Sequence, residues 1–464
     1  MKYIPRISIL LLFILNNALG QSYTATYGSA YAGSSGIRNN PAASVNSAFK
    51  WEVTPFSVQT KASTNSFSLS KYELALIPDS MNRFFHHNVD VSFLNVLYKL
   101  NTSSALAFNL RGRAYNHIRT SPVSASNSIS SIQEFMNLNN DHAYLDATVT
   151  HNGWIQADLN YSKVIQENYN SRLTAGATLQ IHKNISGAFA RIGKLSYLES
   201  KFPSDTVYTF TAGSAALAYS SNYDGSAPGA GSPVKEFLKN SLTSLGISLG
   251  VEYLLYNELT NNYQQNNALN YQWKIGVALM DLGANRFKPS EYASQFRNLN
   301  PNITDNSLDN KLLNTLLGND FRDSLATIFS NGEAITSNFK IGNPTRLVIN
   351  IDRSFGKGLF INGDLNINLH GSSNNRKLLT REINLLTITP RWETLSWGFY
   401  MPVQFNSQKQ FHIGAAIKAG PLMIGLHNIQ WAKDIRNLSG GGYLMLRIHP
   451  FNKKRLLNKL DCPE

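Results

Sequence analysis

The residues of this sequence that are best suited to bind a charged ligand stand at every second position of one segment. The row consists of Asn109, Arg111, Arg113, Tyr115, His117 and Arg119. Residues two apart lie on the same face of a β-strand. Three arginines on a lipid-facing surface would each cost about 2–4 kcal/mol, so the row should face water. We keep two interpretations: the arginines balance lumen acids such as Asp146 and Asp158, or they form an anion-selective or ligand-binding wall.

The two acids come from the clearest alternating stretch, residues 143–161, in which odd positions are mostly apolar and even positions mostly polar. This period of two predicts strand with one apolar and one polar face. The Asn152-Gly153 pair favours a hairpin, with a three-residue turn at 151–153 that keeps all apolar residues on one side. In that hairpin Asp146 would lie opposite Asp158.

Motifs for catalysis and metal binding are missing. The sequence has no Gly-x-Ser-x-Gly and no His-Glu-x-x-His, and the glycine-rich stretch 225–233 lacks the Gly-Lys-Ser/Thr ending of a phosphate-binding loop. His86 and His87 are adjacent, so on a strand they point to opposite faces and make a poor chelate. We therefore predict no enzyme, no cofactor and no metal. The basic residues are scattered, so we also predict no nucleic-acid partner.

The first twenty residues predict an exported protein. Lys2 and Arg6 precede an apolar run, and Ala18-Leu19-Gly20 provides a small-residue cleavage site, as in a secretory signal peptide. The apolar run is too short to span a bilayer as a helix. The single cysteine, Cys462, allows no internal disulfide.

The remaining composition favours a membrane-spanning sheet. The chain has 24 Phe and 21 Tyr, only 15% charged residues, and many alternating segments of about ten residues, which together are typical of a transmembrane β-barrel. No later segment has the long apolar run of a transmembrane helix. An array of soluble β-sandwiches would need two or three domains with linkers, which the sequence lacks. We predict an all-β fold: a single antiparallel transmembrane barrel of about 14 strands, within a range of 14–18.

The chain divides into a signal peptide (1–20), an N-terminal plug or arm (21–46), the barrel (47–450) and a basic periplasmic tail (451–464). Leucines at helical spacing predict a helical insertion at 303–330, which would be either a self-packing extracellular loop or a lid or apolar ligand platform. One helical turn is expected near 132–138. Glycines on the polar face of the strands at 245–256 and 271–283 would leave room where the wall curves or the plug approaches.

Several segments resemble an uncharacterised family of Gram-negative outer-membrane β-barrels related to FadL-type transporters of hydrophobic compounds. They are the strings LGISLGVEYLLY (245–256), YQWKIGVALMDLG (271–283), TPRWETLSWGFYMPVQF (389–405) and AGPLMIGLHN (419–428) and the ending Asp461-Cys462-Pro463. The Gly/Ala-rich segment that ends in Asn40, Pro41 and Ala42 resembles the N-terminal plug of FadL-type transporters. The resemblance implies a location in the outer membrane, contact with its lipid, and passive transport or binding of small hydrophobic compounds. The alternative is a scaffold or secretion-linked carrier that holds partner proteins through its extracellular loops.

Overall fold

The computed structural model describes residues 24–70, 73–203, 205–224, 237–238, 240–256, 271–312, 319–370, 377–429 and 439–449. The predicted signal peptide, the basic tail with Cys462 and the glycine-rich stretch 225–233 lie outside these residues.

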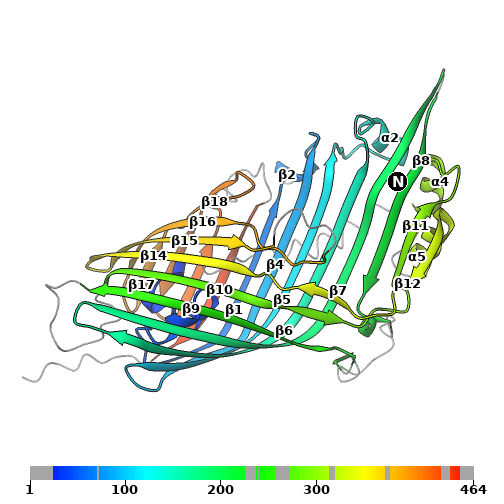
Figure 1. Ribbon diagram of the computed structural model, residues 1–464. Coiled ribbons are helices and arrows are strands. Elements are labelled where there is room, and N and C mark those ends of the chain that lie inside the picture. Colours follow the sequence, from blue (N-terminus) through cyan, green and yellow to red (C-terminus); the bar gives the residue numbers. More distant parts are fainter. Residues whose placement is uncertain are drawn as a thin grey trace, which may run out of the picture.

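Fourteen antiparallel staves form a closed barrel (Figure 1). Here a stave is one strand of the wall, or two short strands that follow each other along the chain. Each stave pairs with the next, and the last pairs with the first through Val58 and Leu444. In order around the wall the staves are β1 (Trp51–Thr64), β4 (Met81–Lys99), β5 (Ser104–Val123), β6 (Leu145–Glu167), β7 (Ser171–Phe202), β9 (Thr243–Tyr256), β10 (Tyr271–Phe287), β14 (Arg346–Gly356), β15 (Leu359–Asn368), β16 (Leu385–Glu393), β17 (Trp397–Tyr400) with β18 (Val403–Asn406), β19 (Phe411–Ile413) with β20 (Ala415–Ala419), β21 (Leu422–Leu426) and β22 (Gly440–Ile448). The predicted barrel and its strand number are confirmed.

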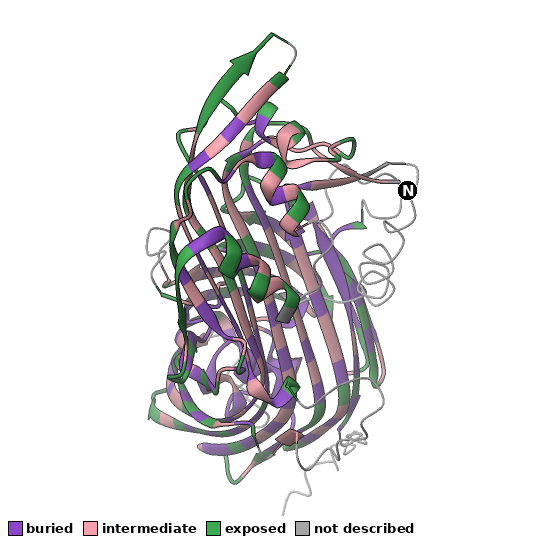
Figure 2. Ribbon diagram, turned by 90° about the vertical axis from the view of Figure 1, so that its right-hand side faces the viewer, coloured by how far each residue is buried: buried purple, intermediate pink, exposed green. Residues whose placement is uncertain are grey.

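The alternation in the sequence becomes an inside and an outside. On β9 the residues Leu245, Ile247, Leu249, Val251 and Tyr253 are exposed, whereas the serines, glycines and Glu252 between them are buried. The same alternation of buried and exposed residues follows most strands of the wall (Figure 2). An apolar outer face and a polar inner face are what a membrane-spanning barrel requires.

The predicted hairpin at 151–153 is wrong. Residues 145–167 form the single strand β6, which pairs with β5 on one side and β7 on the other. A turn of three residues and an uninterrupted strand give the same alternation of apolar and polar positions. The periodicity of the sequence therefore could not distinguish a hairpin from a single strand. Asp146 and Asp158 therefore lie on the same strand and do not face each other.

The two ends of the barrel differ. At one end, called here the short-turn end, brief connections such as residues 100–103 and 168–170 join the strands, and both the start of β1 and the end of β22 lie there. At the opposite end, the loop end, β7 extends as a hairpin with β8 (Asp205–Tyr219) beyond the wall (Figure 1). A separate small hairpin, β2 (Phe67–Ser70) with β3 (Glu73–Leu76), connects β1 to β4, and β13 (Phe339–Gly342) extends the pairing of β10.

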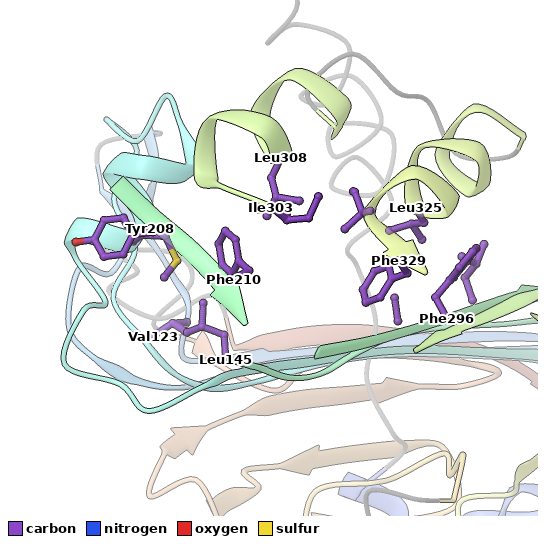
Figure 3. Packing of buried hydrophobic residues seen from close by; sticks show 13 residues of the cluster. Val123, Leu145, Tyr208, Phe210, Phe296, Ile303, Leu308, Leu325 and Phe329 are labelled. Carbon is purple, nitrogen blue, oxygen red and sulfur yellow. The ribbon is translucent and has the colours of Figure 1, made fainter. Parts of the chain in front are cut away.

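A compact layer of helices and strands, called here the cap, stands at the loop end. It consists of the outer part of β7, β8, β11 (Ser294–Leu299), β12 (Phe329–Ala334), α2 (Ile132–Asn137), α4 (Asp305–Leu312) and α5 (Asn319–Ile328). Figure 3 shows Leu308 and Leu325 packed among Phe210 and Phe329. The predicted turn near 132–138 and the helical insertion are thus present. None of the described helices is long and apolar enough to cross a membrane.

The candidate functional site: a plugged, charged lumen

The N-terminal segment folds as a plug inside the barrel. Its three 3-10 helices are η1 (Thr24–Thr26), η2 (Ala30–Arg38) and η3 (Pro41–Ser44). The side chain of Ser29 caps η2 by accepting from the Tyr31 N–H, and Asn40 caps η3 by accepting from the Ala42 N–H at 2.9 Å. Pro41 occupies the first position of η3, where its missing N–H costs nothing.

The Asn40-Pro41 step rests on a cradle of three wall glycines. A Cβ atom on Gly176 of β7 would collide with the Pro41 carbonyl, and one on Gly250 of β9 would collide with the Asn40 side chain. A Cβ on Gly276 of β10 would lie 2.8 Å from the Asn40 amide nitrogen. Glycines on the polar face of β9 and β10 therefore make room for the plug, which is one of the two reasons predicted for them.

Polar side chains fix the plug to the wall on many sides. Asn40 also donates to the Val251 carbonyl at 2.8 Å. The side-chain pairs, with their shortest distances, are Ser29 with Glu393 (2.8 Å), Ser34 with Glu52 (3.2 Å), Asn39 with Asp364 (2.8 Å), Ser44 with Asn160 (2.7 Å) and Asn46 with Glu252 (2.7 Å). Because these partners come from five different strands, the plug is held across the short-turn half of the lumen.

Above the plug lies a layer of buried ion pairs, called here the girdle. Arg111 reaches both Asp90 at 2.9 Å and Asp158 at 3.1 Å. Asp281 accepts from Arg113 at 3.0 Å and from Arg346 at 2.8 Å. The predicted balancing of lumen arginines by acids is therefore present for Asp158.

A loop before β16 enters the lumen and completes the girdle. Its Glu382 lies 3.5 Å from Arg346 and accepts from the Tyr115 hydroxyl at 2.9 Å. Burial alone would raise the pKa of Glu382, but the charges of Arg346, Lys61 and Arg113 outweigh it and lower that pKa. Arg346 also donates to the Arg38 carbonyl at 3.0 Å, which links the girdle to the plug.

A second charged group lies deep at the short-turn end. Arg391 contacts Asp352 at 2.6 Å and Glu393 at 2.8 Å, and these three side chains are at most 1% exposed. Arg447 lies 3.2 Å from Glu52 and donates to the Ala32 carbonyl of the plug. These charges hold wall and plug together.

The remaining predicted residues lie at the loop end. His117, Arg119 and Asp146 line a cavity of about 290 Å³, called here the mouth cavity. His117 contacts His86 and accepts from the Arg381 N–H at 3.0 Å. No ion pair joins Asp146 to any described residue, so the predicted balancing fails for this acid. The predicted polar row on β5 is thus divided. Arg111 and Arg113 are paired with carboxylates in the girdle, whereas His117 and Arg119 line the mouth cavity.

Sequence reasoning missed much of the charged lumen. Asp90, Asp281, Arg346, Asp352 and Arg391 were not singled out, although each lies on a strand. The available signal was parity, because a charge on an alternating strand must stand on its polar face. Among the described residues, no group of three or more His, Cys, Asp or Glu side chains is placed to hold a metal ion.

Comparison with known protein families shows to which family the chain belongs. The model of a family described as a family of unknown function, DUF5723, matches residues 41–427. The chain belongs to this family. The match runs from Pro41 of the plug to the end of β21, so the DUF5723 family model includes nearly the whole barrel. No curated protein sequence matches the chain.

The solved structures to which the chain is similar include a FadL homologue and a toluene transporter. A FadL homologue from Pseudomonas aeruginosa is 12% identical, with a TM-score of 0.39 over 93% of this chain and 97% of that one. The toluene transporter TodX from Pseudomonas putida is 10% identical, with a TM-score of 0.35 over 93% of this chain and 95% of that one. Likeness at this level says nothing of what the DUF5723 chain binds.

Proposed function

We propose that this protein is a gated outer-membrane barrel, through which small compounds pass when the plug moves. Its substrates would be hydrophobic, the class that the FadL-type resemblance implies. The observation that carries the proposal is that a separate N-terminal segment lies inside the barrel and is held to the wall by polar contacts. A barrel of this size has a lumen wider than its wall side chains alone can fill.

The nature of the plug contacts supports movement. Most of them join single polar side chains on or beside the 3-10 helices to polar residues of the wall. Each such hydrogen bond contributes only about 0.5–3 kcal/mol, and water can replace it when the lumen hydrates. A plug held in this way can leave its seat without exposing a large apolar core.

The first experiment unseats the plug. In Gly176→Ala the new Cβ collides with the backbone of Pro41 and Ala42, and that backbone cannot turn aside as a flexible side chain would. We expect liposomes that contain this variant to swell several times faster in a small-solute assay than liposomes with the wild type. The matched control is Gly363→Ala, where the nearest atom to the added Cβ is 3.9 Å away. Equal swelling rates for all three proteins would refute the plug as the barrier.

The second experiment locks the plug. The hydroxyl oxygens of Ser44 and Ser162 lie 2.7 Å apart, at the positions that cysteine sulfurs would take, so Ser44→Cys with Ser162→Cys in a Cys462→Ser background should form a disulfide. Oxidised cells should lose uptake of a labelled hydrophobic compound, and a reductant should restore it. Each single cysteine variant is the control. Unchanged uptake by the locked protein would contradict passage through the lumen.

One observation favours the alternative role as a scaffold or secretion-linked carrier. The cap has its own apolar core, with thirteen buried residues that include Met136, Tyr208 and Ile328, at the loop end of the barrel. A folded layer of this kind could hold partner proteins. Site-specific photo-crosslinking from exposed Leu198 on the β7–β8 hairpin tests this role in intact cells. The role is rejected if a defined partner is never recovered.

A further inference from the structure

The mouth cavity has a charge composition that differs from the rest of the lumen. Its walls come from β5, β6, β7 and the loop before β16. Five cationic side chains line it, and a single carboxylate, Asp146, accompanies them. The cations are Arg119, Arg191, Lys194, Lys377 and Arg381.

These five cations lack ion-pair and side-chain hydrogen-bond partners within the described part of the chain. No ion pair or side-chain hydrogen bond between described residues engages their guanidinium or ammonium groups, although Lys194 lies 5.9 Å from the ring centre of Tyr144. Burial and the neighbouring charge of Arg119 lower the pKa of Arg381. Five like charges gathered around a single carboxylate repel one another, and an anion among them would relieve that repulsion.

The cavity faces the lumen and not the lipid. Ile118, Val149 and Ile192 are exposed on the outer face of the same strands. Because neighbouring residues on a strand point to opposite faces, Arg119, Thr150 and Arg191 point inward. A lipid headgroup on the outside of the wall therefore does not reach these cations directly.

We propose that the mouth cavity binds a free small molecule that carries a phosphate, sulfate or carboxylate group. Guanidinium groups bind such planar or tetrahedral oxyanions through paired charge-assisted hydrogen bonds, and the lysines add point charges. A cavity of about 290 Å³ accommodates the anionic group and a small attached body. The site goes beyond the proposed passage, because binding here does not require the plug to move.

The test measures binding of inorganic phosphate to the purified full-length protein in non-ionic detergent, by calorimetry at constant ionic strength. We expect saturable binding to the wild type and binding at least about tenfold weaker for Arg119→Gln with Arg381→Gln, which removes two charged donors. The control is Lys201→Gln, at an exposed position on the β7–β8 hairpin, which should bind phosphate as the wild type does. Unchanged heat-modifiable gel mobility would show that all variants are folded barrels.

Two results would overturn the proposal. One is an absence of saturable phosphate binding to the wild type, and the other is equal binding by the wild type and the double variant. A parallel titration with detergent micelles that contain phosphatidic acid separates the sources of phosphate. Binding to such micelles alone would refute a free ligand. Liposome passage can fail while phosphate still binds, so this proposal and the proposed function are judged separately.

Discussion

The two halves of the lumen differ in whether their cationic side chains are paired with carboxylates. In the girdle and at the short-turn end, every arginine that we described lies against at least one carboxylate, as Arg391 does against Asp352 and Glu393. In the mouth cavity, Arg119 and Arg191 have no such partner among the described residues. Both regions belong to the same polar inner face, and in part to the same strand, β5. The difference therefore lies in which opposite charges the neighbouring strands supply.

The contrast separates charges that hold the structure from charges available to a ligand. A buried ion is tolerated only when a partner and hydrogen bonds replace its lost hydration. The girdle satisfies that condition within the chain itself. The mouth is more open to water, so its cations remain solvated without partners and are free to exchange water for an anion.

The largest expected effect comes from breaking a paired charge. Arg391→Met leaves Asp352 and Glu393 buried without their cation, and we expect a loss of about 3–5 kcal/mol in the free energy of unfolding. Urea unfolding in detergent, followed by tryptophan fluorescence, measures this loss. Adding Asp352→Asn to Arg391→Met should recover part of the stability, because it removes one uncompensated charge. A double variant no more stable than the single one would point to lost packing instead.

A smaller effect is expected where plug and wall share a hydrogen bond to a charged group. Asn46→Ala removes donation to Glu252 at 2.7 Å and to Thr174 at 3.1 Å, and such a bond is worth about 1.5–3 kcal/mol. The plug should exchange its amide hydrogens faster, whereas the β9 and β10 amides should be unchanged. Asn65→Ala, at a half-buried amide outside the plug that donates to the Asn82 carbonyl at 2.8 Å, is the control. Faster exchange throughout the barrel would mean that the plug and the wall unfold as one unit.

The sequence predicted the parts of this molecule that depend on local pattern. Alternation around Leu249 revealed the two faces of the wall, and Leu308 with its helical neighbours revealed the insertion. The turn at 151–153 was wrong because Asn152-Gly153 is a hairpin signal that also fits within a continuous strand. The charge partners were missed for another reason: Arg113 and Asp281 are 168 residues apart, and only barrel closure and strand register bring them to 3.0 Å. The pairing of arginines with carboxylates in the girdle depends on how the closed sheet brings distant strands together. The scarcity of carboxylates at the mouth depends on the same arrangement.

The smallest expected effect lies in the mouth itself. Arg191→Gln removes no ion pair between described residues, so the free energy of unfolding should change by less than about 0.5 kcal/mol. Because the substitution relieves repulsion among like charges, the change should be toward greater stability at low salt. At 1 M salt the Debye length falls to about 3 Å, and the difference from wild type should disappear. Unfolding at several sodium chloride concentrations measures this. A large salt-independent loss of stability would show that Arg191 has a structural partner, and the contrast between the paired interior and the open mouth would then fail at this residue.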